Sequence, residues 1–200
     1  MTSKALSPAS RILEMAAGLP EGMPMSARSL LHLGSRVAID QALSRLARSG
    51  AILRAGRGLY VRPIKTRFGV RSPAAAAVLA RLAEETGEAI VSHGAAAANA
   101  LGLTTQVPVR EIHLTSGRTR KLQLGAQTIE LRHAPRWQLA RHQAGEVVRA
   151  LHWLGPTRGA AGVTQLARNL RKADVRELLS LRGRLPTWLA REVSALAVRS

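Results

Sequence analysis

A polar stripe is expected along one side of the helix that follows Ser35. Its side chains recur three and four residues apart and supply an amide, a hydroxyl and two guanidinium groups: Gln41, Ser44, Arg45 and Arg48. An amide can hydrogen-bond a base edge, and a guanidinium can bind a base edge or a phosphate. The stripe therefore favours contact with double-stranded DNA. The alternative is a basic face that is only solvated, as most charged helix faces are.

The candidate DNA contacts extend from this stripe to the start of the helix and to a turn that follows it. They are Ser35, Arg36, Val37, Ala38, Gln41, Ser44, Arg45, Arg48 and Arg57. Arg57 stands between Gly56 and Gly58, so the turn can bring one cation close to another surface. Asp40 is the only acid in the helix and is expected toward the edge of the stripe, which leaves the surface basic.

Local signals define the helix that positions the stripe. Ser35 is a favourable N-cap, and Gly50 stands at the usual C′ position. The buried side is expected to hold apolar residues at the helical period: Ile39, Leu43, Leu46 and Ala47. Two short strands follow at residues 51–54 and 59–62, joined by a tight turn over residues 55–58.

Two earlier segments complete the order of a known DNA-binding unit. A helix is predicted from Pro8 to about Ala17, and Ser26 is predicted to cap a short helix. The inward residues of the short helix are expected to be Leu30, Leu31 and Leu33. Helix, short helix, turn, helix and hairpin is the order of a winged helix-turn-helix. We therefore assign residues 1–62 to a winged-helix DNA-binding domain.

Residues 63–72 join this domain to the next. They include a proline, a glycine and several basic residues, and they are predicted to form a linker. The alternative is an ordered strand that joins the following sheet, with Phe68 and Val70 alternating inward.

Residues 73–135 alternate helical and strand patterns and are predicted to form a small α+β domain. Alanine-rich helices are expected up to about Thr86, where Gly87 ends the first, and at residues 93–101. The strands are expected at residues 89–92, 111–115, 120–124 and 128–132, the last two as a hairpin. The buried face of this hairpin is expected to hold Leu122, Leu124, Ile129 and Leu131. An antiparallel sheet with one solvated face has this pattern.

Residues 136–200 are expected to form a helical C-terminal region. Its helices are predicted at about residues 143–154, 161–171, 174–182 and 186–198. Trp153 and Trp188 are expected to be core or anchor residues. The whole chain is therefore expected to have an α+β fold, with an N-terminal winged helix-turn-helix, a central antiparallel sheet and a helical C-terminus.

The net charge of +18 points to a polyanionic partner. The positive charge is spread over all three predicted regions. No helix pairs a lysine-rich face with bulky aromatics, and no apolar run approaches the roughly 18 residues of a membrane span. Because the chain also lacks cysteine and a signal peptide, we expect a soluble cytoplasmic protein that does not bind membranes.

The acidic residues do not support catalysis. The chain has only two aspartates, Asp40 and Asp174, and they are far apart in sequence. Gly34 and Ser35 form a Gly-Ser pair like that of nucleotidyltransferases, but no Asp-x-Asp follows it to hold metal ions. We therefore expect no enzyme activity, no catalytic residue and no cofactor.

The histidines are expected to have structural roles. His93, His113 and His133 are spaced by twenty residues. His113 and His133 each lie on a predicted strand or at its end, without a cysteine or a paired carboxylate nearby. Either Ser92 or His93 is expected to cap the helix that begins at residue 94. No metal site is predicted.

Two runs of the sequence resemble the AbiEi-type antitoxins of bacterial type IV toxin–antitoxin systems. One resembles the N-terminal domain of that family and covers residues 34–63, GSRVAIDQALSRLARSGAILRAGRGLYVRP. The other resembles the antitoxin domain and covers residues 92–134, SHGAAAANALGLTTQVPVREIHLTSGRTRKLQLGAQTIELRHA. Residues 136–200 resemble the family only in being helical.

This resemblance implies a repressor of its own operon that also counteracts a toxin with a nucleotidyltransferase fold. The toxin is either bound directly or opposed only through its target. Two other functions stay open from the residues themselves: a plain transcriptional regulator without a toxin, and an RNA-binding protein that uses the dispersed arginines. The oligomeric state, monomer or dimer, is also open.

Overall fold

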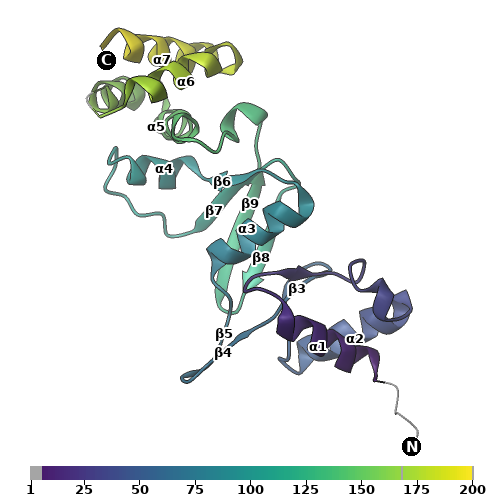
Figure 1. Ribbon diagram of the computed structural model, residues 1–200. Helices are drawn as coiled ribbons and strands as arrows, with labels where there is room; N and C mark the ends of the chain where they lie inside the picture. The colour runs from purple at the N-terminus through teal and green to yellow at the C-terminus, as the bar shows by residue number, and fades with distance from the viewer. Residues whose placement is uncertain (1–5, 168, 200) are drawn as a thin grey trace, which may run out of the picture. The chain divides into compact units, whose positions relative to one another are not determined.

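The predicted α+β class is confirmed by a computed structural model of the protein, which describes residues 6–167 and 169–199 (Figure 1). Its sheets are antiparallel where their register is given, and its C-terminal region is helical. The chain forms two compact units. The first contains the residues up to Glu88 together with Lys121–Ile129, and the second contains Ala89–Arg120 and the residues from Glu130 onward.

The first unit begins with the predicted helix-turn-helix. Helix α1 spans Pro8–Gly18, a 3₁₀ turn η1 spans Leu31–Leu33, and helix α2 spans Arg36–Arg48. Ser35 caps α2 as predicted, since it accepts a hydrogen bond from the Ala38 N–H, and Ser7 caps α1 by accepting from the Ser10 N–H. The buried core of this region includes Ile12, Ala16, Leu30, Ile39, Leu43, Leu46, Ile52 and Tyr60.

The short helix expected after Ser26 is only a 3₁₀ turn. Leu30 is fully buried and Leu33 partly buried, but 46% of Leu31 is exposed, so the prediction for Leu31 is wrong. The Leu33 N–H donates to the Leu30 carbonyl over 2.9 Å. This i→i+3 bond aligns residues three apart and turns Leu31 away from the core.

The wing is a three-stranded sheet in the order β1-β3-β2. Strand β1 spans Pro24–Met25, β2 spans Leu53–Gly56 and β3 spans Leu59–Val61. Gly56 pairs with Leu59, so the turn consists of Arg57 and Gly58 and is shorter than predicted. Ala55, which was expected in the turn, lies in β2 and is fully buried. Strand β1 was not predicted.

Residues 63–72 form neither a linker nor a strand of the next sheet. They fold into a separate two-stranded hairpin of β4 (Ile64–Thr66) and β5 (Gly69–Arg71). Phe68 is 86% exposed and Val70 66% exposed, so the inward alternation is wrong. Alternation buries a strand face only where another layer covers that face.

The central part consists of helix α3 (Ala75–Thr86) and a four-stranded sheet in the order β6-β7-β9-β8. The strands are β6 (Ile90–Ser92), β7 (Glu111–Thr115), β8 (Arg120–Leu124) and β9 (Gln127–His133). All four hairpin residues predicted to face inward are buried.

The compact units differ from the predicted division at residues 62, 72 and 135. In the first unit, a Cβ atom built at Gly22 would lie 2.7 Å from the backbone of Ala77, so α3 packs closely against the loop before β1. A Cβ atom at Gly56 would lie 3.6 Å from the Leu122 side chain, so the tip of the β8–β9 hairpin packs against the wing. These tertiary contacts join segments that lie far apart in the sequence.

The second unit is mainly helical. Its helical elements are α4 (Gly94–Ala100), η2 (Arg136–Gln138), α5 (Gln143–Leu166), α6 (Lys172–Leu181), η3 (Arg182–Arg184) and α7 (Thr187–Arg199). Helix α5 is interrupted at Gly155, where the backbone leaves helical geometry, close to the predicted break. Trp153 and Trp188 are partly buried and pack against the apolar core. Among the helices of the described residues, none is long and apolar enough to cross a membrane.

Candidate nucleic-acid interface

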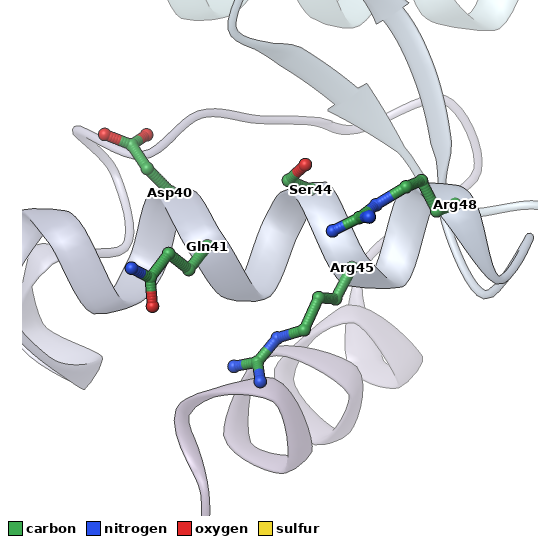
Figure 2. A pocket seen from close by; sticks show the side chains of 5 residues that line it. All are labelled: Asp40, Gln41, Ser44, Arg45 and Arg48. Atoms are coloured by element: carbon green, nitrogen blue, oxygen red, sulfur yellow. The ribbon is translucent and has the colours of Figure 1, made fainter.

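Helix α2 is amphipathic, and its burial leaves the predicted polar stripe on the surface. Ile39, Ala42, Leu43 and Leu46 are buried in the core of the first unit. The opposite side is a shallow hollow lined by Asp40, Gln41, Ser44, Arg45 and Arg48 (Figure 2). The structure therefore brings together all four residues of the stripe.

The polar side chains that line the hollow follow one another along α2, as a helix that lies in the major groove of DNA requires. Figure 2 shows Gln41 and Arg45 on one flank of the helix, with both side chains extending away from it. On the other flank Arg48 reaches back toward Ser44, and Asp40 lies at the far edge. Arg45 and Arg48 are exposed, and neither forms an ion pair with a residue in 6–167 or 169–199. Two guanidinium groups are thus free to meet an anion.

The first turn of α2 is less available than the stripe. The Ser35 hydroxyl is used as the cap, since it accepts from the Ala38 N–H over 3.4 Å. The Arg36 Nε donates to the Asp40 carboxylate over 2.8 Å, which balances both charges. Val37 is 66% exposed, whereas Ala38 is half-buried. In this turn Val37 is therefore an exposed apolar contact, and Arg36 adds little net charge.

The wing presents Arg57 at its tip. Arg57 is exposed, and Gly58 after it has the positive φ of +68° that this tight turn requires. Arg54 is also exposed, and its Nε donates to the Gly56 carbonyl over 3.4 Å. Arg54 was not among the predicted contacts, although the alternation of Leu53, Arg54 and Ala55 along β2 places it on the outer face.

If the wing touches DNA, replacing Arg57 by alanine should weaken binding several-fold and lower the log–log salt slope by about one. The free energy of unfolding should change by less than about 0.5 kcal/mol, because the side chain is exposed. Fluorescence anisotropy over a salt series and thermal melting measure the two effects. Arg118→Ala, in the exposed turn before β8, is the matched control. If Arg57→Ala lowers the melting temperature but leaves the affinity for DNA unchanged, the role of Arg57 is structural.

The histidines occupy structural positions. His93 caps α4, since its Nδ1 accepts from the Ala95 N–H over 3.2 Å, and burial lowers the pKa of His93 and favours this neutral acceptor form. The expectation for His113 is wrong in one respect, because its Nε2 lies 3.2 Å from the Glu111 carboxylate. The pair was missed because residues two apart on a strand share a face. His133 Nδ1 lies 2.9 Å from the Gly117 carbonyl.

Comparisons with known proteins cover most of the chain. The sequence matches the model of a family described as "Family of unknown function (DUF6088)" over residues 11–178. The crystal structure of the RV2827C protein from Mycobacterium tuberculosis is similar, with a TM-score of 0.51 and 16% sequence identity. The match covers 96% of this chain and 76% of that chain, and at this identity it concerns the fold alone. No curated protein was found to match.

Proposed function

The chain belongs to the DUF6088 family, whose function is unknown. We propose from its own residues that it binds duplex DNA through α2, and from its resemblance to the AbiEi-type antitoxins that it represses the operon that encodes it. One observation carries this proposal. The exposed side of α2 presents Arg45 and Arg48 without ion pairs among the described residues, beside Gln41 and Ser44. Such a set of donors suits phosphates and base edges in a major groove.

The polar side chains of α2 contact different parts of the DNA in this proposal. Arg45 and Arg48 bind phosphates or guanine edges, and Gln41 is placed to bind adenine through its amide. Arg57 adds a backbone contact from the wing. The net charge of +18 attracts the protein to DNA of any sequence, and the base contacts then select the operator.

The resemblance of residues 92–134 to an antitoxin domain supports a second part of the proposal. The protein counteracts a toxin with a nucleotidyltransferase fold, either by binding it or through its target, and both act in the cytoplasm. The structure forms α4, β7, β8 and β9 from this segment, which begins at the last residue of β6. A transcriptional regulator without a toxin partner would have the same α2 surface, and no toxin would be encoded next to it.

Two measurements test the two parts. Electrophoretic mobility shifts with duplexes that tile the region upstream of the coding sequence test operator binding, with mixed-sequence duplex and RNA as competitors. Co-expression with the neighbouring reading frame tests neutralisation by growth. Specific DNA binding without growth rescue would indicate a transcriptional regulator without a toxin partner. Stronger binding to RNA than to any DNA duplex would contradict the DNA-binding proposal.

Gln41→Ala should relax specificity more than it lowers affinity for mixed-sequence DNA. A bidentate contact to adenine discriminates by about 1–3 kcal/mol, so the operator affinity should fall roughly 5- to 160-fold and the affinity for random duplex much less. Competition binding with both DNAs measures the ratio. Gln106→Ala, an exposed glutamine of the second unit, is the control. Equal losses for both DNAs would show that Gln41 reads no base.

A further inference from the structure

The β4–β5 hairpin exposes the chain's only phenylalanine. Phe68 lies at the hairpin tip and is 86% exposed. The chain has few aromatic residues, and this one does not contribute to a core. Every residue from Lys65 to Arg71 is exposed, and only Ile64 is partly buried. Val70 on β5 is also exposed, so the hairpin offers apolar side chains next to basic ones, a combination that suits contact with a charged partner.

The hairpin tip is ordered by its own hydrogen bonds. Thr66 Oγ1 donates to the Gly69 carbonyl over 3.0 Å and accepts from the Phe68 N–H over 3.2 Å. The Arg67 guanidinium lies over the Phe68 ring, 4.6 Å from its centroid. The tip therefore presents a cation stacked on a ring, with most of the ring still exposed.

The base of the hairpin is fixed to the first unit. The Glu21 carboxylate accepts from Arg71 Nη1 over 3.0 Å and from the Ala74 N–H over 2.9 Å. These contacts lower the pKa of Glu21, led by the Ala74 N–H, and keep it charged at neutral pH. The charge of Arg71 is thus balanced by Glu21 at the base of the hairpin. Lys65 and Arg67 form no ion pair with residues 6–167 or 169–199.

The hairpin begins beside the residues that directly follow α2. A groove in the first unit is lined by Gly50 and Ala51, just after α2, and by Ile64, Lys65 and Val70 of the hairpin. Arg45 and Arg48 occupy the last turn of α2. The hairpin and the basic last turn of α2 therefore belong to the same compact unit, and the groove links the hairpin to the residues that directly follow this turn.

We propose that the β4–β5 hairpin is a second DNA-binding arm, in which Lys65 and Arg67 bind phosphates and Phe68 inserts against a base step in the minor groove. This inference rests on the proposed binding of duplex DNA by α2. Proteins that contact the minor groove commonly combine basic side chains with an apolar wedge that partly unstacks one step. A cation stacked on an exposed ring at the end of a narrow hairpin supplies both groups at one point.

Variants of Phe68 test whether its side chain inserts into DNA or makes no contact with it. With fluorescent duplexes that tile the region upstream of the coding sequence, Phe68→Ala should bind about tenfold more weakly than wild type. Phe68→Leu keeps an apolar wedge and should retain most of the affinity. A duplex carrying 2-aminopurine at the contacted step should brighten on binding wild type but not Phe68→Ala. Val109→Ala, which alters a fully exposed valine of the second unit, should bind like wild type.

The charge of the arm is tested with a double variant. Lys65→Ala with Arg67→Ala should lower the log–log salt slope by about two. Lys172→Ala with Arg176→Ala removes the same charge from the exposed face of α6 and should leave the slope nearly unchanged. All these side chains are exposed, so melting temperatures should stay close to that of wild type.

The outcomes distinguish this inference from the function on which it rests. If the hairpin variants bind duplex like wild type while Arg45→Ala with Arg48→Ala loses binding, the hairpin is no DNA contact and the function of α2 stands. If wild-type protein binds none of the duplexes, both proposals fail. If the hairpin variants lose binding only to RNA, the arm serves RNA and the inference is overturned.

Discussion

Replacing Arg45 and Arg48 together by alanine should weaken operator binding roughly 10- to 100-fold and lower the log–log salt slope by about two. Both guanidinium groups are exposed on α2 and form no ion pair with the described residues, so neither is balanced in the free protein. Each one that meets a phosphate releases condensed counterions from the DNA, which is what the slope measures. Anisotropy titrations over a salt series give both quantities.

Folding has to be excluded as the cause of such a loss. Arg45 and Arg48 lie in the last turn of α2, where a cation stabilises the helix dipole by about 0.3–1 kcal/mol each. Alanine has the highest helix propensity, which offsets part of that loss, so the melting temperature should change little. Arg182→Ala with Arg184→Ala removes the same charge from exposed positions in η3. Equal effects of the two double variants would show that only net charge matters.

The candidate interface on α2 could be predicted because helix periodicity decides it locally. Ser35 fixes the start of the helix, and the buried set of Ile39, Leu43 and Leu46 then fixes which side is exposed. The Arg36–Asp40 pair follows from the same i,i+4 spacing, although it was not predicted. Local spacing of this kind needs no knowledge of the rest of the fold.

The β4–β5 hairpin could not be predicted in the same way. The alternation of Phe68 and Val70 is compatible with an inward face, and only the absence of a covering layer leaves both side chains exposed. Strand β1 has two residues, too few for a pattern, and it exists because Pro24 and Met25 pair with Val61 and Tyr60. Both features depend on tertiary contacts.

The boundaries of the compact units have a similar origin. Leu122 lies near residue 56 in space, so the tip of the β8–β9 hairpin belongs with the N-terminal elements. A fragment that ended at residue 65 would lack α3 and this hairpin tip, both of which pack in the first unit. The DNA-binding function is therefore best tested in the full chain.

Gly94→Ala should destabilise the second unit strongly, although alanine normally favours a helix over glycine. A Cβ atom at Gly94 would lie 2.5 Å from the Arg149 carbonyl oxygen and 2.6 Å from the Trp153 Cβ atom, so α4 and α5 cross in direct contact at this point. The contact is with the main chain and with a Cβ atom, neither of which can rotate away. Overpacking of this kind typically costs about 1–3 kcal/mol, against a gain of about 1 kcal/mol at most from helix propensity.

Tryptophan fluorescence isolates this effect, because Trp137, Trp153 and Trp188 all lie in the second unit. In urea, the fluorescence transition of Gly94→Ala should shift to lower denaturant, since a variant that loses stability without changing compactness changes the midpoint and not the slope. Gly183→Ala is the control, because its added Cβ atom would meet nothing within 4 Å. An unchanged or higher midpoint for Gly94→Ala would mean that α4 moves away from α5 at little cost. In that case the close crossing of α4 and α5 would not stabilise the second unit.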